Sequence, residues 1–252
     1  MSDKVVIVTG GSRGIGAEVC KLAGAQGYHV LVNYVSNQNA ADDVVSEITQ
    51  DGGKAFAIQG DVQHEADVLK MFDAAKAQGK IVGLINNAGV VDTTARLDEM
   101  SMDRLNRMFA INLTGAFVCA REAVKAMSSR HGGSGGSIVN ITSAAAKLGA
   151  GSQYLDYASA KGAIDTMTIG LAREVAEEGI RVNAVRPGII DTDIHASGGL
   201  PDRAQELKHL IPMKRPGTAL EVAKAVMWLL SDDASYSTGA IIDVSGGRSV
   251  LP

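Results

Sequence analysis

The amino-acid sequence predicts a single doubly wound α/β domain over residues 1–252, with about seven parallel strands and helices on both faces of the sheet. Two observations carry this prediction. Short, nearly all-apolar runs alternate with longer amphipathic stretches, and no proline- or serine-rich linker divides the chain. Such alternation is typical of βαβ units, and strands that are buried on both faces are apolar throughout.

The apolar runs and the helical patterns can be placed in order along the chain. The expected strands are Val5–Val8, His29–Asn33, Ala55–Gln59, Val82–Ile85, Gly136–Ile141, Arg181–Val185 and Ala240–Asp243. The expected helices are Ile15–Gln26, Ala40–Gln50, Glu65–Ala77, Ser101–Ser129, Tyr157–Glu178 and Ala219–Ser231. The glycine cluster at 132–136 is short enough to be a helix-to-strand turn rather than a linker.

Composition excludes several classes of protein. With 46% hydrophobic and 21% charged residues, the chain has the balance of an ordinary globular protein. Its net charge of −4, with no basic stripe, predicts no nucleic-acid partner. No apolar run reaches the roughly 18 residues of a membrane span, and the charged start at Met1–Lys4 predicts no signal peptide. We therefore expect a cytoplasmic protein without membrane contact.

Cysteine and histidine usage predicts neither a disulfide framework nor a metal site. Cys20 and Cys119 are too few for a disulfide scaffold and have no metal-ligand spacing. The five histidines are scattered, and His195 fits no catalytic arrangement. The chemistry of this chain must therefore be sought elsewhere.

Polar and glycine residues follow the carboxyl ends of five predicted strands, which is the edge where open parallel sheets bind ligands. These segments are Thr9–Ser12, Asp61, Asn86–Gly89, Thr142–Ser143 and Pro187–Gly188. Each could be an ordinary turn by itself. Their convergence on one edge predicts a ligand site there.

The segment from Thr9 to Gly16 joins the first strand to the first helix. Glycines at 10, 14 and 16 permit a tight turn and close approach of a pyrophosphate, which the free N–H groups of the helix N-terminus would bind. We expect the rest of this loop, Ser12, Arg13 and Ile15, to contact the cofactor too. The spacing GxxxGxG differs from the commoner GxGxxG, and a glycine turn without a ligand is the alternative.

The end of the second strand bears on which dinucleotide binds. Asn33, Tyr34 and Ser36 stand where an acidic residue would hold the adenosine ribose of NAD, and no carboxylate occurs there. Arg13 in the glycine loop could pair with a ribose 2′-phosphate. The sequence therefore favours NADP(H), with NAD(H) as the alternative if Arg13 is merely a solvated surface residue.

Tyr157 and Lys161 lie one helical turn apart and share a face. A free tyrosine has a pKa of about 10, and a nearby ammonium would lower it. Tyr157 could then exchange a proton with a carbonyl or alcohol oxygen. The neighbouring Tyr154 is a poorer candidate, because the fourth residue after it is Ala158.

Taken together, these residues resemble the short-chain dehydrogenase/reductase family over nearly the whole chain. The resemblance rests on Thr9–Gly16, Asp61–Val62, Asn86–Gly89, Asn112, Ser143, Tyr157, Lys161, Arg181–Asn183, Pro187–Gly188 and Gly246–Gly247. It implies a Rossmann-type sheet and a nicotinamide cofactor. Within the family, the chain looks most like the 3-oxoacyl-carrier-protein reductase and glucose-dehydrogenase group, whose members are usually homotetramers.

The resemblance also implies a role for each matching residue. Ser143 would bind the substrate oxygen, Tyr157 would exchange the proton, and Lys161 would bind the nicotinamide ribose. Asn112 would hold a water that links Lys161 to solvent. The remaining cofactor contacts would come from Asp61, Val62, Asn87, Ala88, Gly89, Pro187, Gly188, Ile190 and Thr192.

The identity of the substrate does not follow from the sequence. The loop between Ser143 and Tyr157 is one residue longer than is usual in the family, and no charged clamp for an anionic substrate is evident. We expect a medium-sized, neutral or weakly polar carbonyl compound or alcohol. The segment 191–216 is expected to be a substrate lid, with a rigid surface excursion as the alternative.

Two functional classes remain. The first is an enzyme that transfers a hydride between the nicotinamide and a carbonyl or secondary alcohol, with Tyr157 as the general acid or base. The second is a catalytically silent dinucleotide-binding regulator or scaffold. The presence of both Tyr157 and Lys161 favours the enzyme, because loss of either would be expected in a silent relative.

Overall fold

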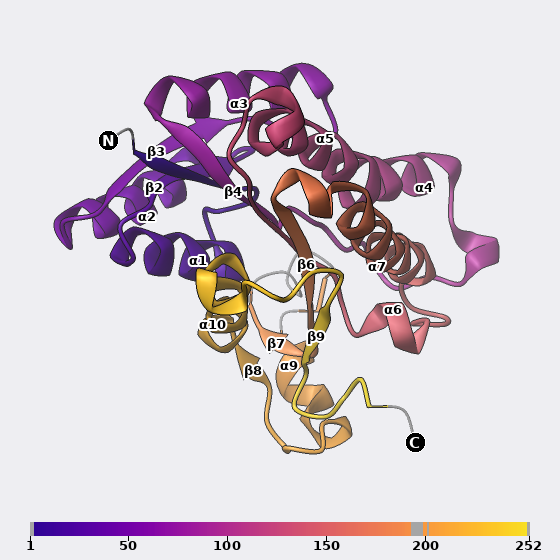
Figure 1. Ribbon diagram of the computed structural model, residues 1–252. Coiled ribbons are helices and arrows are strands. Elements are labelled where there is room, and N and C mark those ends of the chain that lie inside the picture. The colour runs from indigo at the N-terminus through magenta and orange to yellow at the C-terminus, as the bar shows by residue number, and fades with distance from the viewer. Residues whose placement is uncertain (1–2, 193–198, 201, 251–252) are drawn as a thin grey trace.

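The computed structural model describes residues 3–192, 199–200 and 202–250. Its main sheet is fully parallel and confirms the predicted fold class, with the strand order β3-β2-β1-β4-β5-β6-β9 (Figure 1). The strands are β1 (Lys4–Val8), β2 (His29–Tyr34), β3 (Lys54–Gln59), β4 (Lys80–Asn86), β5 (Gly136–Ile141), β6 (Ile180–Pro187) and β9 (Ile241–Val244). The order reverses between β1 and β4, which opens the crevice where such sheets bind ligands.

Helices cover both faces of the sheet (Figure 1). They are α1 (Gly14–Ala25), α2 (Gln38–Gln50), α3 (Glu65–Gln78), α4 (Met102–Phe109), α5 (Gly115–Met127), α6 (Ala145–Leu148), α7 (Leu155–Val175), α9 (Arg203–Glu206) and α10 (Ala219–Leu230). On one face, α1, α2 and α10 bury an apolar cluster that includes Val6 and Val32. On the other face, α3, α5 and α7 pack over Ile7 and Leu31. The alternation of adjacent strand residues between two cores explains why the strands are apolar throughout.

The predicted helix over Ser101–Ser129 is two helices in the structure. A π-helical turn over Ala110–Thr114 separates α4 from α5 and contains the buried Asn112. The Asn112 amide Nδ2 donates to the carbonyl of Met108 at 3.1 Å, within the same stretch of helix. A side chain that hydrogen-bonds to its own helix backbone accompanies this kind of local widening, and π-helical turns are common at functional sites.

The segment after β6 forms a small sheet of its own. Strand β7 (Ile190–Asp191) pairs in parallel with β8 (Gly217–Thr218), and α9 and a short 3₁₀ helix (Leu207–Leu210) lie between them. The predicted lid over 191–216 therefore contains regular structure, although 193–198, with His195, and 201 lie outside the described residues. Whether this segment moves stays a prediction.

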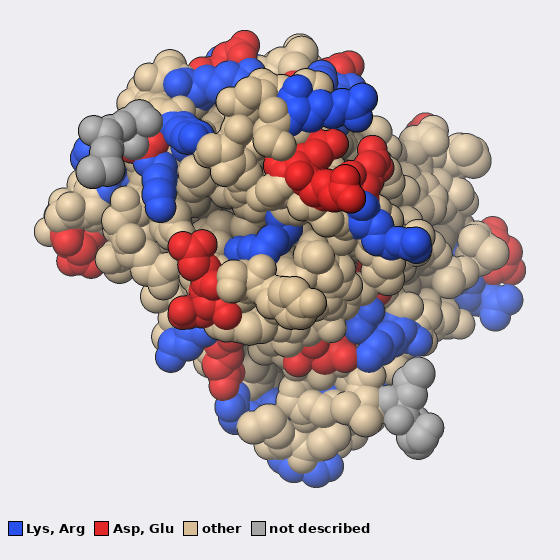
Figure 2. All heavy atoms as spheres, in the orientation of Figure 1, with Lys and Arg blue, Asp and Glu red and all other residues tan. Residues whose placement is uncertain are grey.

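Acidic and basic side chains are interspersed over the face shown in Figure 2. Among the described residues, no helix combines the length and hydropathy needed to cross a lipid bilayer. The same residues contain no group of three or more His, Cys, Asp or Glu side chains arranged to hold a metal ion.

Candidate active site

The glycine loop between β1 and α1 has the conformation that its glycines permit. Gly10 and Gly14 have φ angles of +62° and +55°, which residues with a Cβ rarely adopt. A Cβ on Gly16 would lie 2.3 Å from the carbonyl oxygen of Gly10, so the loop closes on the helix only with glycine there. The loop is therefore a cradle of backbone at the positive end of α1, which fits the pyrophosphate of a dinucleotide.

Asn33 holds this loop in place from inside the protein. The side chain is 1% exposed, and its Oδ1 accepts from the backbone N–H of Gly10 at 3.1 Å. Its Nδ2 donates to the carbonyl of Gly60 at 2.8 Å and also to that of Ile58. Asn33 thus ties the glycine loop to the end of β3, an internal role that differs from the cofactor contact expected from the sequence.

The other residues expected near the adenosine divide between buried and exposed positions. Tyr34 is the last residue of β2 and is 7% exposed, whereas Ser36 and Arg13 are exposed. Among the described residues, the Arg13 side chain has no hydrogen-bond or ion-pair partner. Arg13 and Ser36 are therefore available to a ligand, and their contact with one stays a prediction.

Asp61 and Asn87 also brace the backbone of the cleft. Asp61 Oδ1 accepts from the N–H of Gln63 at 3.1 Å, and Val62 packs beneath Gly115, where a Cβ would lie 2.8 Å from its Cγ2. Asn87 Nδ2 donates to the carbonyls of Thr9 and Gly10 at 2.9 and 3.0 Å. These bonds fix the crevice between β1 and β4.

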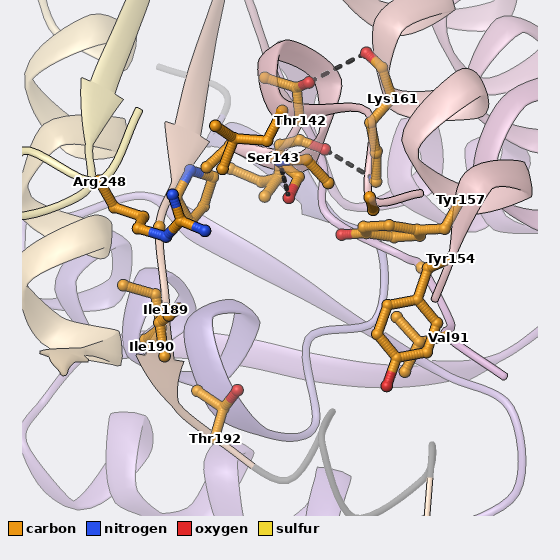
Figure 3. A pocket seen from close by; sticks show the side chains of 18 of the residues that line it. Val91, Thr142, Ser143, Tyr154, Tyr157, Lys161, Ile189, Ile190, Thr192 and Arg248 are labelled. Carbon is orange, nitrogen blue, oxygen red and sulfur yellow. Dashed lines mark hydrogen bonds between the residues drawn. The ribbon is translucent and has the colours of Figure 1, made fainter. Parts of the chain in front are cut away.

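Ser143 and Tyr157 reach one cavity from different elements (Figure 3). Ser143 follows β5, and its Oγ accepts from the N–H of Ala145 at 3.1 Å. Tyr157 lies in the first turn of α7 and directs its hydroxyl toward the Ser143 side of the cavity. The cavity has a volume of about 310 Å³ and is also lined by Lys161 and Gly89.

Lys161 lies beneath Tyr157 and is 3% exposed. Its Nζ donates to the carbonyl of Ile141 at 2.8 Å and lies 5.7 Å from the centroid of the Tyr157 ring. Burial lowers the pKa of Lys161 to about 8, against the opposing charge of Asp165. Lys161 therefore still carries its charge at pH 7, but it loses its proton more readily than a solvated lysine because there is little solvent around it.

The pKa of Tyr157 differs from the expectation of the sequence. Burial raises the pKa of the phenol, and a hydrogen bond with Ser143 opposes that rise. The predicted net decrease is therefore wrong for the protein without a ligand, because removal of solvent from the phenolate outweighs the stabilisation around it. The phenol keeps its proton at neutral pH.

Asn112 and Lys161 approach each other beside Gly89. A Cβ on Gly89 would lie 2.8 Å from Asn112 Oδ1 and 3.5 Å from Lys161 Nζ, so glycine leaves room for both. The Asn112 side chain also binds both backbone groups of Val90, accepting from its N–H at 3.1 Å and donating to its carbonyl at 3.0 Å. The π-helical turn therefore brings Asn112, the fourth member of the predicted set, to this site, and its water-holding role stays a prediction.

A buried ion pair fixes the start of α7, the helix that carries Tyr157 and Lys161. Arg104 Nε on α4 donates to the Asp156 carboxylate at 2.8 Å, and the Asp156 side chain is fully buried. The Arg104 guanidinium also donates to the carbonyl of Thr93. Since Asp156 precedes Tyr157 directly, this pair holds the first turn of α7 against α4.

The segment after β6 closes the other side of the cleft. Pro187 ends β6, and Gly188 packs so tightly that a Cβ would lie 2.7 Å from the Cα of Ser245. Ile190 is buried, and Thr192 lies beside Gly14 of the glycine loop. The residues predicted to flank a nicotinamide therefore line the same cleft as Ser143 and Tyr157.

The cavity is also lined by two arginines that were not among the site residues predicted from the sequence. They are Arg203 at the start of α9 and Arg248, which follows β9. The position of Arg248 after a strand end and a glycine pair was a signal that could have found it. Arg203 had no comparable signal, because only the fold brings α9 to the cavity.

Comparison with known proteins agrees with this geometry. Residues 10–249 match the family model described as enoyl-(acyl carrier protein) reductase. The chain is 51% identical to the uncharacterized oxidoreductase YgfF of Escherichia coli, over 97% of this chain and 99% of that protein. It is 36% identical to glucose 1-dehydrogenase 2 of Bacillus subtilis, over 100% of this chain and 97% of that one.

A solved structure extends the likeness to the whole fold. A short-chain dehydrogenase/reductase from Serratia marcescens superimposes with a TM-score of 0.90 at 34% sequence identity, and the match covers 99% of both chains. At this identity and coverage, the likeness concerns the sequence as well as the arrangement of strands and helices.

Proposed function

The chain belongs to the short-chain dehydrogenase/reductase family of NAD(P)-dependent oxidoreductases, and from that premise we propose that it is an NADP(H)-dependent carbonyl reductase with Tyr157 as its proton donor. The observation that carries the proposal is the convergence of Ser143, Tyr157 and Lys161 on one cavity at the carboxyl edge of the sheet. That cavity adjoins a glycine loop whose shape fits a dinucleotide pyrophosphate.

Each side chain around the cavity would have a different role in the reaction. A bound nicotinamide dinucleotide supplies the hydride. The Ser143 and Tyr157 hydroxyls would bind the substrate oxygen, and Tyr157 would donate its proton to that oxygen as negative charge develops there. Tyr157 holds a proton to give at neutral pH, because its pKa lies above the ordinary tyrosine value. In the reverse direction the same phenol would accept the proton of an alcohol.

Lys161 would serve both the cofactor and Tyr157. Its Nζ lies within 5.7 Å of the Tyr157 ring centroid, where a positive charge stabilises the phenolate that remains after proton donation. The cofactor itself would be held by the glycine loop, by Thr192 beside Gly14 and by Ile190 and Gly188 at the cleft. The preference for NADP(H) is supported by exposed Arg13 and by the absence of a carboxylate directly after β2.

We also infer self-association and a cytoplasmic location. Helices α5 and α7 expose Phe117 and Ile169, at 49% and 48% of their surfaces, which supports contacts with further copies of the chain and a homotetramer. Cys20 and Cys119 are buried free thiols, as is usual in a reducing compartment.

An absorbance assay at the nicotinamide band tests the proposed activity. NADH and NADPH are each offered with ketones, 3-oxoacyl thioesters, sugars and secondary alcohols. We expect turnover of at least one carbonyl class with a preference for NADPH. A strong NADH preference would overturn the cofactor assignment, and the absence of turnover across the panel would favour a silent dinucleotide-binding protein.

A further inference from the structure

Arg248 reaches the cavity from the β9 edge of the sheet, whereas the glycine loop follows the inner strand β1. Strand β9 is the edge strand, four strands away from β1, which at about 4.8 Å per strand places the two strand ends roughly 19 Å apart. Figure 3 shows the Arg248 side chain extending toward the side where Ser143 and Tyr157 lie. Arg248 therefore serves the substrate side of the cavity rather than the pyrophosphate side.

The turn that carries Arg248 is built to hold it there. Gly246 and Gly247 have φ angles of +58° and +87°, and a Cβ on either would lie 2.9 Å from Ile211 or Pro212. The N–H of Arg248 donates to the carbonyl of Ser245 at 3.0 Å, which closes the turn. The backbone of Arg248 is thus fixed against the segment that precedes β8, while its guanidinium is left to the cavity.

The charges that line this cavity all have the same sign. Among the described residues, the lining contains Lys161, Arg203 and Arg248 but no Asp or Glu. Neither an ion pair nor a side-chain hydrogen bond engages Arg248 within the described part of the chain. The nearest acidic group on the preceding strand, Asp243, is already paired with Lys147 and Arg186.

Arg203 approaches from the other side of the cavity. Its guanidinium lies 5.0 Å from the centroid of the Tyr154 ring and donates to Gln153 Oε1 at 2.6 Å. Stacking on an aromatic ring leaves guanidinium N–H groups free along its edge. Arg203 is thus oriented by neutral partners, and its side chain has no ion-pair partner among the described residues.

The rest of the lining is largely apolar, with side chains of Val91, Leu148, Ile189, Leu207 and Leu210. An apolar cavity with the Arg248 guanidinium at one side fits a ligand that has a short carbon skeleton and a single anionic group. We propose that the substrate is an aliphatic oxo acid, or the corresponding hydroxy acid, whose carboxylate binds Arg248. The oxo group faces Ser143 and Tyr157. This assignment rests on the proposed function and replaces the neutral substrate expected from the sequence.

A binding experiment that needs no turnover tests the assignment. Hexanoate and hexanamide, which share size and shape and differ in charge, are titrated into the full-length protein by calorimetry. Since a guanidinium–carboxylate contact is charge-assisted, we expect hexanoate to bind about tenfold tighter than hexanamide. Equal affinity for the two, or no measurable binding of hexanoate, would overturn the proposal.

Substitutions assign the discrimination to Arg248. Arg248→Met should remove the preference for hexanoate, and Arg248→Lys should restore part of it. Arg130→Met is the matched control, because the Arg130 side chain is 78% exposed and lies before β5, outside the cavity. If Arg248→Met still prefers hexanoate to hexanamide, the assignment is contradicted. Circular dichroism checks that each variant is folded. If Arg248→Met does not fold, Arg248→Gln takes its place.

A turnover experiment separates this proposal from the proposed function. 5-Oxohexanoate and its methyl ester are compared with NADPH, in the wild type and in Arg248→Met. We expect the acid to lose about tenfold in kcat/KM, mainly through KM, and the ester to change less than twofold. If both compounds are reduced equally well and both depend on Tyr157, the anion site is wrong and the reductase stands. If neither is reduced while hexanoate binds through Arg248, the site stands and the reductase is in doubt.

Discussion

The two ends of the cleft use their polar side chains in different ways. At the adenosine end, Asn33 and Asn87 donate to backbone carbonyls of the protein itself and fix the glycine loop. At the reaction end, Tyr157 and Arg248 direct their polar groups into the cavity. We propose that the first set shapes a backbone surface for the cofactor and that the second set contacts the reacting molecule. Substitutions at the adenosine end should therefore lower stability and cofactor affinity together. Substitutions at the reaction end should lower activity without lowering stability.

The largest effect on activity is expected at Lys161, where activity and stability should change in opposite directions. Lys161→Met removes the charge beneath Tyr157, so we expect kcat to fall by about two orders of magnitude or more. The same substitution should raise the free energy of unfolding at pH 7 by about 1 to 2 kcal/mol, because it removes a buried ammonium whose pKa burial has lowered to about 8. Chemical denaturation and initial rates measure the two quantities.

The pH dependence of that stability gain follows from the direction of the shift. Between pH 8 and the ordinary lysine pKa of 10.5, the unfolded wild type binds more protons than the folded wild type. Wild-type stability therefore rises with pH across this window, and the advantage of Lys161→Met is full below pH 8 and shrinks above it. Lys70→Met, on the exposed face of α3, is the control and should show neither effect. A variant that is both inactive and less stable at pH 7 would contradict this account of Lys161.

At the adenosine end, Asn33→Ala should lower stability and cofactor affinity together. The substitution leaves the N–H of Gly10 and the carbonyl of Gly60 without their partner in a buried region, which costs about 2 to 3 kcal/mol of unfolding free energy. Urea denaturation measures the loss. Asn37→Ala is the matched control, because Asn37 caps α2 at the surface through one hydrogen bond and should cost only about 1 kcal/mol. Equal losses in the two variants would show that Asn33 does not brace the loop.

The smallest effect is expected at Arg13, which is exposed and would act only on the cofactor. Arg13→Met should weaken NADPH binding about tenfold, which corresponds to about 1.4 kcal/mol, and should leave NADH binding nearly unchanged. Fluorescence titration with each dinucleotide measures both affinities, with Arg130→Met as the control. An equal loss for NADH and NADPH would mean that Arg13 does not read the 2′-phosphate.

Much of the fold was predictable because buried parallel strands are apolar throughout and glycine turns have a local signature. The order of strands and helices follows from that pattern, and so does the convergence of Ser143, Tyr157 and Lys161 on one edge. The interruption at Asn112 was not predictable, since helical periodicity continues across a π-helical turn. Position along a strand also did not show that the Asn33 side chain is hydrogen-bonded inside the protein, and its expected contact with the cofactor stays a prediction.

The arginines of the cavity illustrate a second limit of the sequence. Arg203 comes from a segment far from Ser143 in the chain, and only the packing of α9 brings it to that cavity, whereas Arg248 follows a strand end and a glycine pair. The pKa of Tyr157 shows the same dependence on three dimensions. The spacing to Lys161 predicted a decrease, whereas the loss of solvent around the phenol decides the direction.

The most direct test of the reaction end is the Tyr157→Phe variant, in which the phenol oxygen alone is lost. NADPH binding and carbonyl reduction are measured on the same preparation, by titration calorimetry and by loss of nicotinamide absorbance. We expect NADPH affinity within about twofold of the wild type and a fall in kcat of roughly two to four orders of magnitude. Turnover that is unchanged in Tyr157→Phe would contradict the assignment of Tyr157 as the proton donor.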